Sequence, residues 1–311
     1  MRRSAEGNRE PRISRAEETS KMTSNPRARA AEPAPLSNQV PGRERLGNRH
    51  AGEVCTGRRL VYQPLVNLQT LDVVGAEALT RFVGPAANGR TVASMIRDLE
   101  RTRTVVEHGR WVLSQSAYDW WKVAPRGWRL NLNVSPMELN CSGYVDELLR
   151  WHPRGGVALE LTETSSEPLS PLGLRNRARL GGLEIPLILD DLGDGYNSVR
   201  RMLALNVEEV KLSRRWSAGI GVCLPAEERL SEILQRLHDL GGRVTVEGVE
   251  TVEQVDWLRH HGVQRAQGFV VARPMPMDEL RSLGRWGTGV ALSVSGGFTD
   301  GRQATTEPAA Q

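Results

Sequence analysis

The chain has 311 residues with 41 basic and 37 acidic side chains, a length that allows one large domain or two ordinary ones. The charge is uneven: residues 1–57 hold ten Arg and one Lys against seven Glu, whereas the rest of the chain holds 30 basic and 30 acidic residues. The main part of the chain is therefore not basic, and no apolar run reaches the roughly 18–20 residues that span a bilayer, so we expect neither a nucleic-acid polymer as partner nor membrane insertion.

The cysteines and the two ends of the chain indicate a cytoplasmic protein with one folded domain. Cys55, Cys141 and Cys223 are far apart and form no CxxC motif, which suits a reducing compartment. The Arg-rich start lacks a following apolar stretch, so no secretory signal is expected. Residues 1–57 are poor in aromatic residues and read as a disordered basic leader, 58–286 as the domain, and 287–311 as a loose tail.

In chain order, short apolar runs alternate with longer amphipathic stretches. The runs predict strands over Arg59–Val66, Val73–Phe82, Trp128–Val134, Val157–Thr162, Ile185–Asp190, Glu208–Leu212, Arg243–Glu247 and Gln264–Val271. The stretches between them predict helices over 91–102, 105–122, 136–150, 171–181, 196–204, 226–240, 251–261 and 276–284. The first two strands are separated only by 67–72, which suits an antiparallel hairpin, and the later alternation implies a parallel sheet. We therefore predict an α/β fold, a (β/α)8 TIM-like barrel with an antiparallel first strand.

Acidic and amide side chains recur where these strands end. They are Glu77, Asn133, Glu160, Asp190, Asp191, Glu247 and Gln267, together with Lys211. Each taken singly is better explained as a solvated strand end or a helix cap. A closed barrel presents the carboxyl ends of its strands to one mouth, and carboxylates gathered there repel one another unless a cation is present. Oxygen ligands without clustered Cys or His favour Mg²⁺ or Mn²⁺ over zinc.

The same residues lie in motifs that resemble those of the EAL-domain cyclic di-GMP phosphodiesterases, a bacterial signalling family. The matching segments are Tyr62-Gln63-Pro64-Leu65-Val66, Glu77-Ala78-Leu79, Asn133-Val134-Ser135, Glu160-Leu161-Thr162-Glu163, Asp190-Asp191-Leu192-Gly193, Glu247-Gly248-Val249-Glu250 and Gln267-Gly268-Phe269. They follow one another in order over about residues 60–280, so the resemblance covers nearly the whole expected domain.

This resemblance implies a metal-dependent hydrolase that converts cyclic di-GMP to linear pGpG with two Mg²⁺ or Mn²⁺ ions, and a homodimer. By position, the metal ligands are Glu77, Asn133, Glu160, Asp190 and, for the second ion, Asp191. The catalytic residues are Lys211, Glu247 and Gln267, the substrate contacts are Arg81, Gln63 and Pro274, and Glu163 stabilises the loop after Asp191.

The chain departs from the family pattern near the catalytic lysine. Leu192 and Asp194 replace the usual Phe and Thr of the loop, and Ser213 replaces an acid two residues after Lys211. Two alternatives therefore stay open: a catalytically weak or inactive cyclic di-GMP receptor or protein-interaction module, and a metal-dependent barrel hydrolase acting on another phosphodiester.

Overall fold

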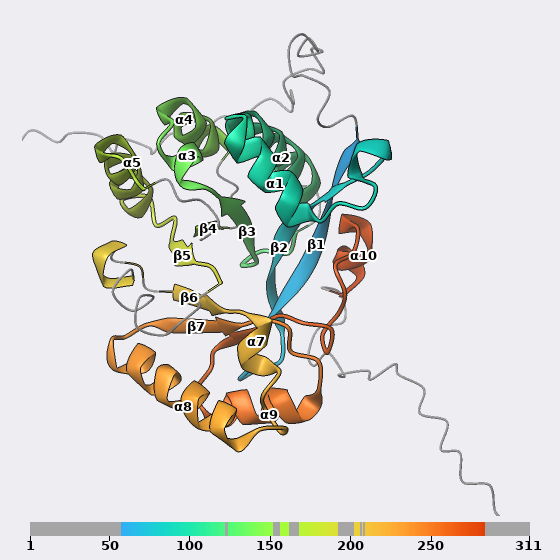
Figure 1. The fold of residues 1–311 in the computed structure, drawn as a ribbon, viewed down its shortest axis with the longest axis vertical. Helices are drawn as coiled ribbons and strands as arrows, with labels where there is room; N and C mark the ends of the chain where they lie inside the picture. Colours follow the sequence, from blue (N-terminus) through green and yellow to red (C-terminus); the bar gives the residue numbers. More distant parts are fainter. Residues whose placement is uncertain are drawn as a thin grey trace, which may run out of the picture. The chain divides into compact units, whose positions relative to one another are not determined.

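A computed structural model describes residues 57–121, 124–151, 156–161, 168–191, 202–205, 207 and 209–283. In this part of the chain, eight strands close into a barrel in chain order (Figure 1). They are β1 Arg58–Asn67, β2 Val73–Phe82, β3 Arg129–Val134, β4 Val157–Leu161, β5 Leu187–Leu189, β6 Glu209–Leu212, β7 Arg243–Val246 and β8 Arg265–Ala266. Strand β1 pairs antiparallel with β2 and β8, and all other pairs are parallel. The predicted barrel with an antiparallel first strand is confirmed.

The β1–β2 hairpin owes its direction to a short turn built on Asn67. The Asn67 side chain accepts hydrogen bonds from the backbone N–H groups of Gln69 at 2.7 Å and Thr70 at 3.2 Å. The Leu71 N–H donates to the Asn67 carbonyl at 2.7 Å, and Leu71 takes a left-handed φ of 62°. An Asn side chain that bonds its own backbone two residues on is a turn former, so this connection is too short for a crossover.

Helices lie outside the strands (Figure 1). They are the 3-10 turn η1 Pro85–Ala87 and helices α1 Val92–Arg101, α2 Val105–Trp121, α3 Pro136–Leu139, α4 Ser142–Trp151, α5 Pro171–Gly181, α7 Arg214–Ser217, α8 Leu224–Asp239, α9 Val252–His260 and α10 Met277–Leu283. Strand β3 illustrates how the strands pack against the helices: its side chains Leu130, Leu132 and Val134 are buried in the hydrophobic core between the two layers. Burial of one such side chain stabilises the fold by roughly 1.5–3 kcal/mol. No helix among the described residues is both long and apolar enough to cross a bilayer.

The strand expected over Ile185–Asp190 is shorter, Leu187–Leu189, the short elements η1 and α7 were not predicted, and two further elements differ more clearly from the structure. The helix expected over 136–150 is divided at Asn140, whose side chain accepts from the Ser170 N–H at 2.8 Å and so ties the end of α3 to the start of α5. Asn favours such bonds over a helix interior. The last strand stops at Ala266, because the chain then turns at Gly268, where a Cβ would lie 2.0 Å from the Val249 carbonyl oxygen. A strand continued through Val271 was therefore a wrong prediction.

Several other expectations fall outside the described residues. These are residues 1–56 of the expected leader, the tail 287–311, Glu163, and the altered loop residues Leu192 and Asp194. Of the helix expected over 196–204, only 202–204 are described, and they are helical.

A buried ion cluster lies at the amino-terminal ends of the parallel strands. The Glu209 carboxylate accepts two hydrogen bonds from Arg129, at 2.8 and 2.7 Å, and one from Arg265 at 2.9 Å. Burial opposes ionisation of Glu209, but the two guanidinium groups outweigh it and lower its pKa to about 2. The carboxyl ends of the strands face the opposite mouth, so this cluster belongs to the stabilising end of the barrel.

Replacing Glu209 by Gln is expected to lower the free energy of unfolding at pH 7 by on the order of 3 kcal/mol. The folded-state pKa is depressed, so the stabilisation is present above the unfolded value near 4.5 and is lost as the pH falls toward 2. Urea unfolding at pH 7 and pH 3 measures this, with the exposed Glu232→Gln on α8 as the matched control. A deficit of equal size at both pH values would contradict the charge argument and point to packing.

Candidate active site

Four carboxylates surround one buried lysine inside the barrel. Lys211 of β6 is 1% exposed. Its Nζ lies 3.0 Å from Glu77 Oε2 on β2, 2.9 Å from Glu160 Oε2 on β4 and 3.6 Å from Asp190 Oδ1 after β5. The same Nζ lies 2.5 Å from Glu247 Oε1 after β7. Four acidic side chains from strands that are distant in sequence thus surround one ammonium group, as expected where parallel strands end at the same mouth of a barrel.

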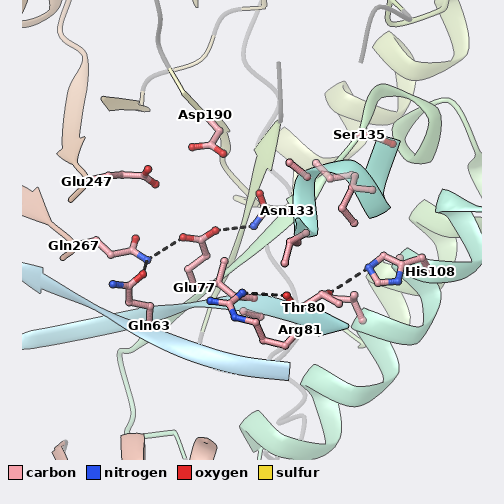
Figure 2. Close-up of a pocket in the computed structure, with 18 of the residues that line it drawn as sticks. Gln63, Glu77, Thr80, Arg81, His108, Asn133, Ser135, Asp190, Glu247 and Gln267 are labelled. Carbon is pink, nitrogen blue, oxygen red and sulfur yellow. Dashed lines mark hydrogen bonds between the residues drawn. The ribbon is translucent and has the colours of Figure 1, made fainter. Parts of the chain in front are cut away.

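Amide side chains orient Glu77 within this cluster (Figure 2). The Nδ2 of Asn133 donates to Glu77 Oε1 at 2.6 Å, and the Nε2 of Gln267 donates to Glu77 Oε2 at 2.9 Å. The same Gln267 nitrogen lies 3.0 Å from the Oε1 of Gln63 on β1. Both oxygens of Glu77 therefore have fixed donors, and its carboxylate is held in one orientation.

The cluster carries more potential negative charge than one lysine balances. Burial, followed by the neighbouring Glu77, holds the pKa of Glu160 well above its usual range. Burial likewise raises the pKa of Asp190, and it raises that of Glu247 to about 7. Burial disfavours the charged form of Lys211, but the surrounding acids outweigh it and raise its pKa. Such a group of buried acids has an electrostatic demand for a further cation.

The donor chemistry of this cluster fits a hard divalent cation. All the charged ligand atoms are carboxylate oxygens, as Mg²⁺ and Mn²⁺ prefer. Two buried oxygens, Asp190 Oδ1 and Gln267 Oε1, have no hydrogen-bond donor. Within the described residues, however, no three His, Cys, Asp or Glu side chains are grouped as they are around a bound ion, and the Lys211 ammonium lies among the acids instead. A cation can take these oxygens only if Lys211 gives up part of its contacts.

A cavity of about 550 Å³ opens above the cluster. Its polar lining includes Gln63, Glu77, Asn133, Asp190, Glu247 and Gln267, together with Thr80, Arg81 and His108 (Figure 2). Val92, Ile96 and Val105 also line it. At its rim, the half-exposed ring of Phe269 lies 4.0 Å beneath the Arg273 guanidinium. The volume is that of a small-molecule site, and the lining combines acidic and amide side chains with apolar side chains from α1 and α2.

Of the remaining predicted site residues that the structure describes, one lines the cavity and the others are outside its described lining. Arg81 lines the cavity and is half-buried, its Nη1 donating to the Thr80 carbonyl at 3.0 Å, and burial lowers the pKa of its guanidinium. Asp191 is exposed with a left-handed φ of 52°, and Pro274 is half-buried. Neither of these two belongs to the described lining of the cavity. Glu163 lies outside the described residues.

The structure also adds site residues that the sequence did not single out. His108 of α2 is 6% exposed and lines the cavity. The Arg58 guanidinium donates to its Nδ1 at 3.1 Å, so the Nε2–H donates to Thr80 Oγ1 at 3.2 Å. Burial, followed by the Arg58 charge, lowers the His108 pKa to about 4, and the ring is neutral at pH 7. No local sequence signal separates this histidine from one on any other helix face.

Comparison with known proteins identifies one protein family and relatives whose names agree with it. Residues 55–274 match the EAL domain family. Among curated proteins, the chain is 28% identical over 233 residues to the bifunctional diguanylate cyclase/cyclic di-GMP phosphodiesterase MucR of Pseudomonas aeruginosa, covering 72% of this chain and 34% of that one. It is 27% identical to the probable cyclic di-GMP phosphodiesterase PdeN of Escherichia coli, covering 71% and 44%. The chain thus spans about a third to less than half the length of these curated relatives.

Solved structures agree with the barrel described here. The phosphodiesterase of P. aeruginosa MucR in complex with cyclic di-GMP superposes with a TM-score of 0.62 at 28% identity, covering 72% of this chain and 94% of that one. The EAL domain of Mycobacterium smegmatis DcpA gives a TM-score of 0.57 at 28% identity, covering 74% and 96%. The family match spans well over half of the chain and includes all eight strands of the barrel. The chain belongs to the EAL domain family.

Proposed function

We propose that this protein hydrolyses cyclic di-GMP to linear pGpG with two Mg²⁺ or Mn²⁺ ions. The observation that carries the proposal is the set of four acids, two amides and one lysine gathered beneath a cavity of nucleotide-compatible size. The relatives named as cyclic di-GMP phosphodiesterases and the MucR complex with cyclic di-GMP support the choice of substrate.

The chain's own residues would divide between ion binding and substrate binding. Glu77, Asn133, Glu160 and Asp190 would hold the first ion, Asp191 would contribute to the second, and Glu247 would bind directly or through water. When bound, the ions activate a water molecule and stabilise charge on the attacking and leaving oxygens of an in-line displacement at phosphorus. Arg81 offers a planar fork that suits a phosphate, and Gln63 and Pro274 would contact the nucleotide.

Lys211 and Gln267 would act next to the reacting water. An ammonium among acids stays protonated, so Lys211 orients the water or offsets charge developing on phosphorus while it keeps its proton. Gln267 already donates to Glu77 and has an unpartnered Oε1, which leaves an acceptor for a water proton. In the proposed hydrolysis, a water oxygen forms a bond to phosphorus and the P–O3′ bond of one ring phosphodiester breaks. The leaving 3′ oxygen takes up a proton, which leaves a 5′-phosphate and a 3′-hydroxyl on a linear dinucleotide.

The second candidate is a cyclic di-GMP receptor with weak or lost catalysis, and Ser213 is the observation that favours it. Ser213 stands at the N-cap position of α7, two residues after Lys211, and makes no side-chain capping hydrogen bond. The family resemblance places an acid at this position, so the chain would lack one carboxylate near the proposed centre. We further propose a homodimer, and one barrel domain over 58–286 between a leader and a tail.

Cyclic di-GMP turnover by the full chain tests the proposal. With Mg²⁺ or Mn²⁺ present, we expect pGpG as the product, and we expect no product after chelation. Chromatography of the reaction mixture measures the product, and light scattering of the same sample measures the dimer. Nucleotide binding without pGpG at high protein concentration would reject the hydrolase and select the receptor.

A further inference from the structure

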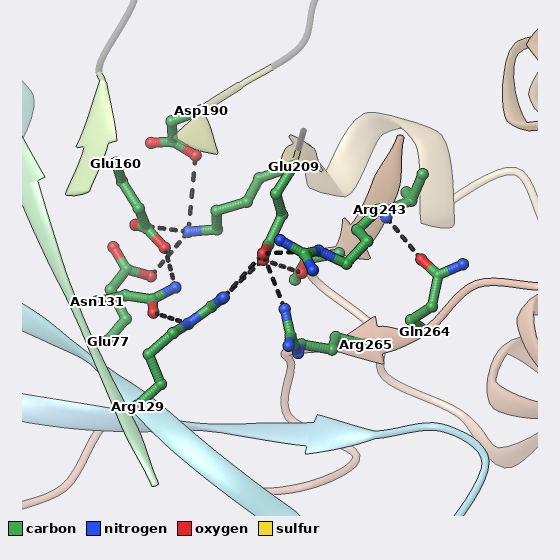
Figure 3. Close-up of polar contacts among 12 residues, drawn as sticks. Glu77, Arg129, Asn131, Glu160, Asp190, Glu209, Arg243, Gln264 and Arg265 are labelled. Atoms are coloured by element: carbon green, nitrogen blue, oxygen red, sulfur yellow. Dashed lines mark hydrogen bonds and ion pairs between the residues drawn. The ribbon is translucent and has the colours of Figure 1, made fainter. Parts of the chain in front are cut away.

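Strand β3 sends three polar side chains into the barrel, spaced two residues apart. They are Arg129, Asn131 and Asn133, and successive residues of a strand point to opposite faces. Asn133 contacts Glu77 at the mouth, whereas Asn131, 1% exposed, lies one layer deeper. Its Nδ2 donates to Glu160 Oε1 at 2.6 Å (Figure 3). Asn131 thus touches a proposed ion ligand from the side away from the cavity.

The hydrogen-bond direction along this row is fixed by chemistry. The Nε of Arg129 lies 2.9 Å from Asn131 Oδ1, and a guanidinium only donates (Figure 3). The Asn131 oxygen must therefore face Arg129, which turns its NH₂ group toward Glu160. The NH₂ group donates, so Glu160 Oε1 is the acceptor of the hydrogen bond from Asn131. Its Oε2 is then the oxygen that faces Lys211, at 2.9 Å.

Arg129, at the end of this row of side chains away from the cavity, belongs to the Glu209 ion cluster at the amino-terminal ends of the strands. Arg129 donates through both terminal nitrogens to Glu209, which also accepts from Arg265 (Figure 3). A guanidinium held by two parallel bonds to a carboxylate has little freedom to rotate. The Glu209 cluster therefore fixes Arg129, Arg129 fixes the Asn131 amide, and the amide fixes Glu160.

We propose that Asn131 and Arg129 are positioning residues that hold the Glu160 carboxylate with one oxygen directed at the cation between the acids. The inference rests on the proposed function only in taking that cation to be Mg²⁺ or Mn²⁺. Partners that orient a ligand in this way typically contribute 10–100-fold to metal affinity.

Three variants of the full chain separate positioning from general stability. Asn131→Leu removes the donor to Glu160 and leaves the Glu209 cluster intact. Arg129→Met breaks both the row and one arm of the cluster. Arg265→Met is the matched control, because Arg265 also binds Glu209, and among the described residues its hydrogen bond goes to Glu209 and not to Asn131. Mn²⁺ affinity without nucleotide, by calorimetry, and the melting temperature of the metal-free protein are measured for each.

We expect Asn131→Leu and Arg129→Met to weaken Mn²⁺ binding about 10–100-fold. Arg265→Met should keep the wild-type affinity within about twofold while its melting temperature falls. Wild-type affinity in Asn131→Leu, equal losses in the two arginine variants, or no Mn²⁺ binding by the wild type would each overturn the inference. If Asn131→Leu does not fold, the difference in Mn²⁺ affinity between Arg129→Met and Arg265→Met tests the inference. Formation of pGpG by the wild type is assayed in parallel. If the wild type forms no pGpG but the variants show the expected differences in Mn²⁺ affinity, the proposed function is rejected and the positioning role stands.

Discussion

Replacing Glu77 by Ala is expected to reduce cyclic di-GMP hydrolysis by at least roughly 10³-fold, the largest loss that we expect for one side chain at this site. Glu77 accepts from Asn133, Gln267 and Lys211, so its carboxylate is the common partner of the amides and the ammonium. Its pKa is lowered because Lys211 and Asn133 together outweigh the effect of burial, and it is thus the acid of the cluster that stays ionised. The substitution would remove a proposed ion ligand, together with the carboxylate that accepts hydrogen bonds from Asn133, Gln267 and Lys211. Steady-state pGpG formation over a range of Mn²⁺ concentrations measures it.

Glu77→Gln is the matched variant, because it keeps the size of the side chain and removes its charge. An amide here places an NH₂ group against the donors of Asn133 or Lys211, so we expect a comparable loss of turnover with the barrel still folded. The exposed Glu232→Gln on α8 controls for the loss of one charge and should retain wild-type turnover. Activity of Glu77→Ala that recovers in excess Mn²⁺ would argue against Glu77 as an indispensable ligand.

The fold was predictable from the sequence because the signals that specify it are local. The turn at Asn67 and the strand-helix alternation required only neighbouring residues, and they led to the correct barrel with its antiparallel hairpin. The acids Glu77, Glu160 and Asp190 could be placed at one mouth for the same reason: each follows from its position on a strand. Their roles as ion ligands remain predictions.

Distances across the barrel were not predictable, because they depend on the stagger between strands. Lys211 was expected beside the acids, but its place among all four depends on the register of β6 with its neighbours β5 and β7 and on the closure of the barrel. The bond from Arg129 to Glu209 joins residues 80 positions apart, and no periodicity reveals it. The short β8 follows from the close approach of Gly268 to Val249, a contact between two loops.

Replacing Lys211 by Met is expected to destabilise the metal-free protein by roughly 3–5 kcal/mol near pH 8, because it leaves buried acids without their ammonium partner. The deficit should shrink at lower pH as Glu247, Glu160 and Asp190, whose pKa values are raised, take up protons. Hydrolysis should fall by about 10²–10⁴-fold, the usual range for a group that acts on a proton or on developing charge. Urea unfolding at pH 8 and pH 6 without metal, and pGpG formation, measure the two effects.

Mn²⁺ provides the decisive comparison for Lys211. In the wild type, a divalent cation must displace the ammonium from oxygens 2.5–3.0 Å away, whereas in Lys211→Met the same oxygens have no such partner. Saturating Mn²⁺ should therefore raise the melting temperature of Lys211→Met by more than that of the wild type, although the variant stays inactive. The conservative Lys211→Arg retains the charge and should show the smaller, wild-type-like shift. Equal shifts in Lys211→Met and the wild type would mean that lysine and metal do not compete for the acids, and that the cation binds elsewhere in the cavity.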